Sequence, residues 1–374
     1  MNLQISIAFI ISLSIIFLFG VSVGVYQIFP YSILNEAKDF FTNLENNEES
    51  KTVSFDQNFL TSLIEVNTEQ DVKNKKMALI EYMWKDGTSL PNTMPSDIEK
   101  NISDNEFDNM KNLKQINKIQ VDMEHKVNSI AYHFISNSPN NELIILHNGH
   151  SGGFHEQKII IQEFLNENYD VIAFSMPLLG LNSQPIVEDS NFGQIHLVNH
   201  NTFHFIENKN FSPMKYFVHP ITLSLNYVED QFAYDSINMI GISGGGWTTI
   251  LYSAIDDRIS KSFPVAGSLP ISLRMESRNI GDYEQTHREF YSIANYLELY
   301  VMGSYGENRM QMHIFNKLDP CCFSGDLSMN YENIIKDRLI VLGNGQFDIE
   351  IDESNTKHSI SKYTLAKIFS EIEK

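Results

Sequence analysis

Residues 241–245 read Gly-Ile-Ser-Gly-Gly, a short G-x-S-x-G pattern whose surroundings constrain the fold more than its letters do. Residues 236–240 form a mostly apolar run of strand length before it, and residues 246–255 read as a helix after it. A strand, a sharp turn with Ser243 at its apex and a helix form the layout of a nucleophile elbow. Small neighbours permit the strained backbone of such a turn. Gly and Ser are also ordinary turn residues, so the interpretation depends on partners for the serine.

The length of the chain limits its number of domains, and its net charge excludes some classes of partner. The chain has 374 residues, of which 42% are hydrophobic, enough for one large α/β domain with extra segments or for two modest domains. Its formal net charge is −20. A surface this acidic repels phosphate backbones and anionic lipid headgroups, so we expect no nucleic-acid partner and no peripheral docking on acidic membranes.

The two cysteines, Cys321 and Cys322, are adjacent and cannot join distant segments. A bond between them would close only a small, strained ring. We therefore interpret them as two small buried hydrophobic residues, with a vicinal disulfide as the alternative. No cysteine spacing typical of a zinc site is present in the sequence.

The N-terminal segment is strongly apolar. Residues 3–29 carry no charged side chain and are long enough to span a bilayer as a helix. A cleaved signal peptide is the alternative, but no Lys or Arg precedes the run. We expect residues 1–30 to be a single-pass membrane anchor. The acidic flank that follows favours a catalytic domain outside the cytoplasm, or a secreted one if the segment is cleaved.

The remaining chain divides into two parts. Residues 31–116 are largely polar and predict a juxtamembrane spacer with a helical segment. From residue 117 to 374, apolar strand-like runs alternate with helical patterns, which predicts a mostly parallel sheet with helices on both faces. Residues 184–212 show no period and are expected to form a cap-like insertion. Catalytic residues should lie on loops at the carboxyl ends of the strands.

A serine nucleophile needs a base and an orienting acid. His358 is the expected base because it lies after the last predicted strand and before the closing helix. Asp319 is the expected acid because it follows the preceding strand, over residues 311–315. Asp326 is the second choice, and Asp352 is closer to His358 in sequence but follows the wrong strand.

An oxyanion hole needs two backbone N–H groups. Gly244, directly after the serine, should supply one, and Gly149 or His150 in the glycine-rich loop after residues 142–146 should supply the other. The same loop offers a weaker alternative, a metal site made by His147 and His150 with His155 as third ligand. We expect no metal and no cofactor.

These residues resemble the α/β-hydrolase superfamily over roughly residues 119–374. The motifs that carry the resemblance are the elbow at 241–245, the His-Asn-Gly-His loop at 147–150, the loop at 177–180 and the order Ser243, Asp319, His358. The resemblance implies an eight-stranded, mostly parallel sheet and Ser-His-Asp hydrolytic machinery. The double glycine after Ser243 is similar to prolyl-oligopeptidase-like and dienelactone-hydrolase-like branches.

The expected function is therefore a serine hydrolase that cleaves carboxylic esters of small molecules through an acyl-enzyme intermediate. A serine peptidase of the same fold is the first alternative. A catalytically inactive hydrolase fold that acts as a binding module is the second.

Overall fold

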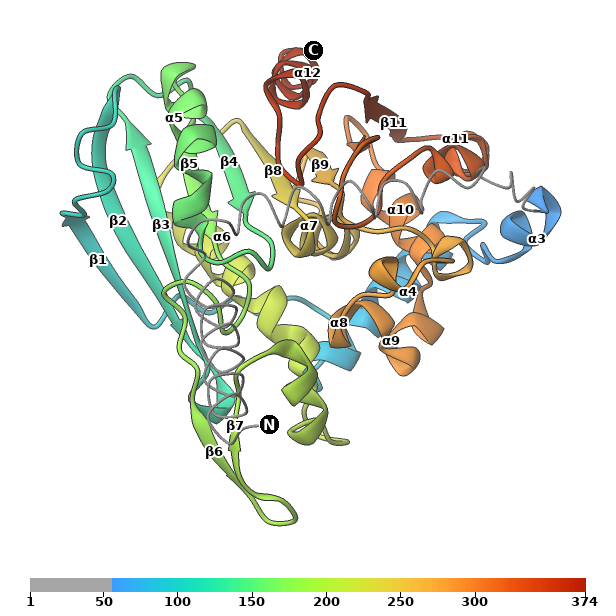
Figure 1. Cartoon of the computed structure of the whole chain (residues 1–374), viewed down its shortest axis with the longest axis horizontal. Coiled ribbons are helices and arrows are strands. Elements are labelled where there is room, and N and C mark those ends of the chain that lie inside the picture. The colour runs from blue at the N-terminus through green and yellow to red at the C-terminus, as the bar shows by residue number, and fades with distance from the viewer. Residues whose placement is uncertain (1–55) are drawn as a thin grey trace, which may run out of the picture. The chain divides into compact units, whose positions relative to one another are not determined.

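The computed structural model describes residues 56–374, which form one compact unit (Figure 1). The expected anchor at residues 3–29 and the first part of the expected spacer lie outside the described residues. None of the helices between residues 56 and 374 is long and apolar enough to cross a membrane.

A nine-stranded sheet forms the centre of the unit, in the order β1-β2-β3-β5-β4-β8-β9-β10-β11. The strands from β5 to β11 in this order are parallel to one another, whereas the pairs β1–β2, β2–β3 and β3–β5 are antiparallel. Their bounds are β1 (Asp97–Ile102), β2 (Leu113–Asp122), β3 (Asn128–Ser136), β4 (Glu142–His147), β5 (Asp170–Phe174), β8 (Ser236–Ile242), β9 (Lys261–Val265), β10 (Met310–Asn316) and β11 (Gln346–Asp352). The expected α/β architecture with a mostly parallel sheet is confirmed.

The expected strand number of eight is too low, because β1 adds a ninth strand at the edge beside β2. The sheet also begins before the expected boundary at residue 117. β1 carries mostly exposed, polar side chains, so no apolar pattern marks it in the sequence. Glu99 of β1 pairs with Lys118 at 3.0 Å. Charged side chains are typical of edge strands, because they discourage pairing with other chains.

The strand order places a topological switch point at the centre of the sheet. The connection after β4 leads to β5 on one side, whereas the connection after β8 leads to β9 on the other side, so the two connections diverge between β4 and β8. In open α/β sheets, ligands bind beyond the carboxyl ends of the strands at such a point. The carboxyl ends of β4 and β8 carry the glycine-rich loop and the G-x-S-x-G turn.

Helices cover both faces of the sheet, as expected. On one face, α5 (Lys158–Asn166) and α12 (Lys362–Ile372) join the apolar side chains of the strands in one core cluster. Phe164 of α5 lies against Phe369 of α12, with ring centroids 4.9 Å apart. The other face carries α6 (His219–Gln231), α7 (Gly244–Ile255), α10 (Tyr296–Ser304) and α11 (Glu332–Leu342).

Two further helices precede the sheet, α3 (Gln57–Ser62) and α4 (Glu69–Trp84). A capping box between Thr68 and Asp71 starts α4. Lys75 of this helix pairs with the buried Glu298 at 3.1 Å, and α4 packs against α7 and α9 (Arg288–Ile293). This part of the expected spacer is therefore packed against the sheet-bearing part of the unit.

The segment between β5 and α6 holds the expected insertion. It contains a separate hairpin, β6 (Ile186–Asp189) with β7 (Gly193–His196), which projects from the unit in Figure 1, and the 3₁₀ helices η3 (His200–Phe205) and η4 (Pro213–Phe217). The other short helices are η1 (Glu124–Lys126), η2 (Phe154–Gln157), η5 (Ile271–Leu273), η6 (Ser277–Asn279), α8 (Tyr283–Thr286) and η7 (Leu327–Asn330).

Candidate active site

Ser243 occupies the turn between β8 and α7 in a strained backbone conformation. Its φ is 58° and its ψ is −123°, in a region that residues with a side chain rarely adopt. Its N–H donates to the carbonyl of Val265 at 2.8 Å, which ties the turn to the end of β9. Strain of this kind persists only where the surroundings hold it, and it is concentrated at functional sites.

Gly149 lies directly against the serine. A Cβ at Gly149 would stand 2.6 Å from Cβ of Ser243 and 2.7 Å from the carbonyl oxygen of Ile242. Such distances are too short for any side chain, so only glycine fits. The neighbouring Asn148 holds the loop, because its N–H donates to the carbonyl of Phe174 at 2.9 Å and its amide donates to that of Gly153 at 2.8 Å.

The imidazole of His150 covers Gly244, the first residue of α7. A Cβ at Gly244 would stand 2.5 Å from Cε1 and 2.7 Å from Nδ1 of that ring. Burial would lower the pKa of His150, but its hydrogen bond to Glu284 and the charges of Glu284 and Asp282 raise it above the usual value. The structure thus gathers the expected oxyanion residues Gly149, His150 and Gly244 around the serine turn.

Asp319 and His358 form a hydrogen-bonded pair. Nδ1 of His358 lies 2.7 Å from Oδ2 of Asp319, whose other oxygen accepts from the N–H of Cys321 at 2.8 Å. Burial would lower the pKa of His358, but the hydrogen bond and charge of Asp319 outweigh it and raise that pKa. Because Nδ1 faces a carboxylate, it carries the proton, and Nε2 presents a lone pair that can accept one.

The two alternative acids, Asp352 and Asp326, have other surroundings. Asp352 accepts hydrogen bonds from the N–H groups of Ser354 and Asn355, at 2.8 and 3.1 Å, and so orders the loop that carries His358. Asp326 stands at the N-terminus of η7, without a hydrogen bond from its side chain to that helix. Of the three candidates, Asp319 is the one that contacts the histidine.

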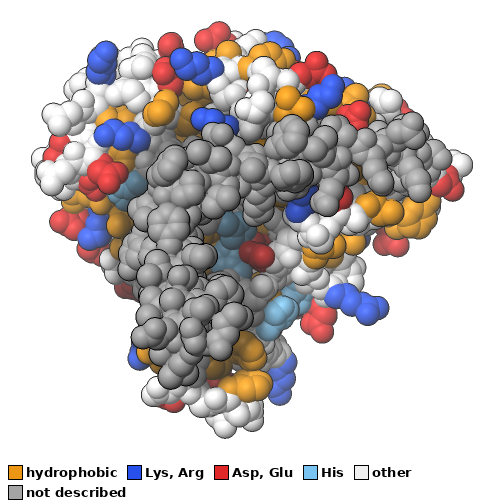
Figure 2. Space-filling model, viewed as in Figure 1, with side chains coloured by type: hydrophobic (Ala, Val, Ile, Leu, Met, Phe, Trp, Pro, Cys, Tyr) orange, Lys and Arg blue, Asp and Glu red, His pale blue; other side chains and the backbone are white. Residues whose placement is uncertain are grey.

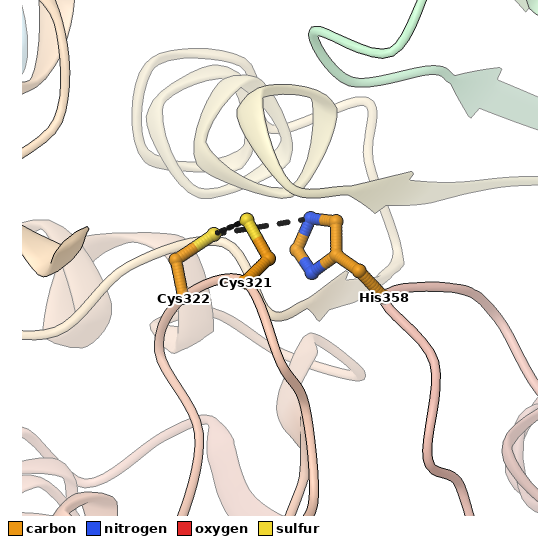
Figure 3. A group of neighbouring side chains, drawn as sticks. All are labelled: Cys321, Cys322 and His358. Atoms are coloured by element: carbon orange, nitrogen blue, oxygen red, sulfur yellow. Dashed lines mark hydrogen bonds between the residues drawn. The ribbon is translucent and has the colours of Figure 1, made fainter. Parts of the chain in front are cut away.

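The two cysteines lie beside His358, as Figure 3 shows. Sγ of Cys322 is 4.0 Å from Nε2 of His358, and the two Sγ atoms are 2.6 Å apart. Both are free thiols, and Cys321 is exposed while Cys322 is buried. The expectation of two buried residues is therefore wrong for Cys321. The hydrogen bond from Cys322 lowers the pKa of the Cys321 thiol to about 6, whereas the pKa of Cys322 is raised.

A second group of polar side chains lies around His150 and was not expected from the sequence. It contains His150, His200, Asp282 and Glu284. Figure 2 shows histidines near the middle of one face with an acidic side chain close by. Burial would raise the pKa of Glu284, but the charges and hydrogen bonds of His200 and His150 lower it. His200 and Glu284 lie in segments without apolar periodicity, so only their residue types hinted at a role.

The metal site considered from the sequence is not formed, because its three histidines have separate surroundings. Nδ1 of His147 lies 2.8 Å from the carbonyl oxygen of Asn148, and burial lowers the pKa of His147 to about 4. His155 instead lies 3.6 Å from Asp104. His219 accepts a hydrogen bond from Trp84 at 3.0 Å and so supports packing.

Two hollows of about 1050 and 1100 Å³ lie at the opposite edge of the sheet, near the amino ends of the strands. Lys261 and Arg309 line both. Neither hollow includes Ser243, His358 or Asp319. The strand-end position and the strained serine, rather than hollow volume, therefore identify the candidate site.

Solved structures that resemble this chain over most of its length identify the fold. An acetyl xylan esterase from Paenibacillus sp. R4 has a TM-score of 0.53 and 13% identity, over 85% of this chain and 99% of that one. Acetyl xylan esterase 1 from Thermoanaerobacterium sp. JW/SL YS485 has a TM-score of 0.54 and 13% identity, over 85% and 97%. The protein has the α/β-hydrolase fold.

A glucuronoyl esterase from Solibacter usitatus shares the α/β-hydrolase fold with a TM-score of 0.50 and 10% identity, over 80% of this chain and 91% of that one. No protein-family model and no curated protein sequence matches the chain. At such low identity, the likeness establishes the fold alone. Function must therefore be argued from the residues at the ends of β4, β8, β10 and β11.

Proposed function

We propose that the protein is a serine hydrolase that cleaves carboxylic esters, with Ser243 as nucleophile, His358 as base and Asp319 as orienting acid. The observation that carries the proposal is the strained Ser243 with Gly149 against it. The Asp319–His358 pair supplies the base that such a serine requires. All of these residues follow sheet strands in the order that the fold uses for its triad.

In the proposed reaction, Ser243 Oγ attacks the ester carbonyl while Nε2 of His358 takes its proton. The tetrahedral oxyanion accepts hydrogen bonds from the backbone N–H groups of Gly244 and of Gly149 or His150. His358 then donates the proton to the departing alcohol, which leaves an acyl group on Ser243. Water, deprotonated by His358, attacks the acyl carbon, and His358 returns this proton to Oγ of Ser243 as the acid is released.

The choice of an ester over a peptide substrate has support from the comparisons, because the solved structures named above are called esterases. Peptidases of the prolyl-oligopeptidase-like branch usually carry a propeller or a large cap. Within residues 56–374, the additions to the sheet are the helices α3 and α4, the edge strand β1 and the β6–β7 insertion, none of which is a propeller. A small-molecule ester therefore fits this chain better than a peptide.

Labelling with a fluorophosphonate probe, followed by mass-spectrometric mapping, tests the proposal. We expect the probe on Ser243, no labelling of Ser243→Ala, and hydrolysis of p-nitrophenyl esters in preference to amino-acyl amides. Preference for the amides would identify a peptidase. A folded protein that neither reacts with the probe nor hydrolyses either panel would be an inactive binding module.

We further infer from the sequence that residues 3–29 hold the enzyme at a bilayer with its catalytic unit outside the cytoplasm. The support is the uncharged apolar run and the acidic flank that follows it. Membrane fractionation and protease accessibility in intact cells test this. Recovery of a shortened chain in the medium would indicate cleavage and secretion instead.

A further inference from the structure

Four metal-ligating side chains converge on one point beside the serine turn. Nε2 of His150 lies 3.1 Å from Oε1 of Glu284, 3.1 Å from Nδ1 of His200 and 3.3 Å from Oδ2 of Asp282. Nδ1 of His200 lies 3.1 Å from Oε2 of Glu284. One potential ligand atom from each residue lies within 4.8 Å of all the others. We propose that His150, His200, Asp282 and Glu284 form a binding site for a zinc(II) ion.

The position of His200 fixes which of its nitrogens faces the group. Nε2 of His200 lies 3.0 Å from the carbonyl oxygen of Pro177, which can only accept a hydrogen bond. Nε2 therefore carries a proton, and in the neutral ring Nδ1 has a free lone pair. A histidine that donates one ring N–H to a backbone carbonyl and presents the other nitrogen to a metal is the usual arrangement of a zinc ligand.

With Glu284 ionised, every protonation state of the two rings leaves two like groups facing each other. If His200 is neutral, its Nδ1 lone pair faces a carboxylate oxygen, and the Nε2–H of His150 is shared among three acceptors. If both rings are doubly protonated, two N–H groups face each other across 3.1 Å. A cation at the centre turns all four groups into ligands at once and also balances the charge of Glu284, whose side chain is fully buried.

The spacing fits the proposed ion. Tetrahedral zinc with bonds of about 2.0–2.1 Å to His and carboxylate ligands places ligand atoms roughly 3.3–3.4 Å apart. The separations of 3.1 to 3.3 Å between Nε2 of His150 and the other three residues are close to this value, and all four ligand atoms lie within 4.8 Å of one another. Imidazole nitrogens suit zinc, whereas calcium and magnesium prefer oxygen ligands only.

The ligands come from three segments that are far apart in the sequence. His150 belongs to the loop after β4, His200 begins η3 in the insertion, and Asp282 and Glu284 stand at the start of α8. A bound ion would join the insertion and α8 to the loop that lies against Ser243. It would also keep the proton of His150 on Nδ1, the nitrogen beside Gly244.

Zinc binding to the untagged full-length chain tests the proposal. A Cys321→Ser/Cys322→Ser background removes the second group of potential ligands, the thiols beside His358. After treatment with a chelator and dialysis, we expect one equivalent of Zn²⁺ by calorimetry and a rise in the unfolding temperature on binding. Cobalt(II) should give the visible spectrum of a tetrahedral site without a sulfur charge-transfer band.

Variants at the ligands separate metal binding from folding. His200→Ala and Glu284→Gln should abolish the stoichiometric binding, and Asp282→Asn, at a partly exposed position, should weaken it at least tenfold while the circular dichroism spectrum is unchanged. His204→Ala is the matched control, because His204 is an exposed histidine in the same η3 helix. Failure of the folded background protein to bind zinc or cobalt, or equal loss in His204→Ala, would overturn the proposal.

Discussion

A 2.7 Å hydrogen bond joins the imidazole of His358 to the carboxylate of Asp319. The side chain of Asp319 has no exposed surface. A buried carboxylate is retained as an anion only where donors stabilise it. Asp319 has three such donors, the His358 ring, the N–H of Cys321 and the side-chain amide of Asn316. The pair is therefore already in a single orientation before any substrate binds.

Replacing Asp319 with Asn should lower kcat for p-nitrophenyl acetate by about 10⁴-fold, because the amide stabilises the wrong tautomer of His358. The matched control is Asp326→Asn, which removes a nearby carboxylate that does not contact the ring and should leave kcat within a few-fold. Equal losses in the two variants would show that the effect is not specific to the pair.

The pH profile should reflect the raised pKa of His358. The base works only when neutral, so activity is present above its pKa and is lost as the pH falls through it. We expect the acid limb of kcat/KM to lie above pH 6.5, the usual value for His. In Asp319→Asn the burial remains but the charge is gone, so the limb should move to lower pH. An unchanged limb would argue against His358 as the titrating group.

Gly149→Ala should reduce kcat/KM by about 100-fold, because the new methyl group displaces the loop or the serine by a large part of an ångström. The clash follows from the 2.6 Å that would separate it from Cβ of Ser243. Ser151→Ala, an exposed change in the same loop, is the control and should retain activity. Esterase assays with a denaturation curve for each variant separate this effect from unfolding.

Ser243→Gly should be more stable than Ser243→Ala by about 1 kcal/mol. Glycine relieves the backbone strain at this φ and ψ, and this gain exceeds the cost of the greater conformational freedom of glycine in the unfolded chain. Urea unfolding of both variants measures the difference. At Ser151, whose φ is not positive, the Gly variant should instead be the less stable of the pair. The same order at both positions would contradict a strained serine.

Iodoacetamide should modify Cys321 at near-neutral pH and inactivate the enzyme, because its thiol has a pKa of about 6 and lies beside the candidate base. Cys321→Ser should resist inactivation. The Cys322→Ser change removes the thiol whose hydrogen bond lowers the pKa of Cys321. The thiolate fraction of Cys321 should therefore fall, and its alkylation should slow by roughly tenfold. Peptide mapping of the modified protein identifies the reactive thiol.

Much of the parallel part of the sheet could be predicted because its strands are apolar on both faces and leave near-continuous hydrophobic runs. β4 and β5 are examples, with buried residues along almost their whole length. β1 has no such run because it is an exposed edge strand, and its place in the sheet depends on pairing with β2. Local sequence therefore could not reveal it.

The candidate site likewise contains residues that the sequence could predict and residues that it could not. Asp319 and His358 could be chosen because each follows a recognisable strand, and strand order fixes which loops meet. His200 and Glu284 could not be paired with His150, because their segments have no periodicity and meet only through tertiary packing. The exposure of Cys321 likewise depends on the course of a loop rather than on residue type.

All residues of α7, from Gly244 to Ile255, are buried beneath neighbouring helices. A substitution anywhere along this helix would change packing that also holds the serine turn, so selection can alter it only at the risk of losing activity. The β6–β7 hairpin is largely exposed and is joined to the sheet through loops, so it can change freely. Descendants of this chain could therefore acquire new substrates through the insertion while their reaction chemistry stays the same.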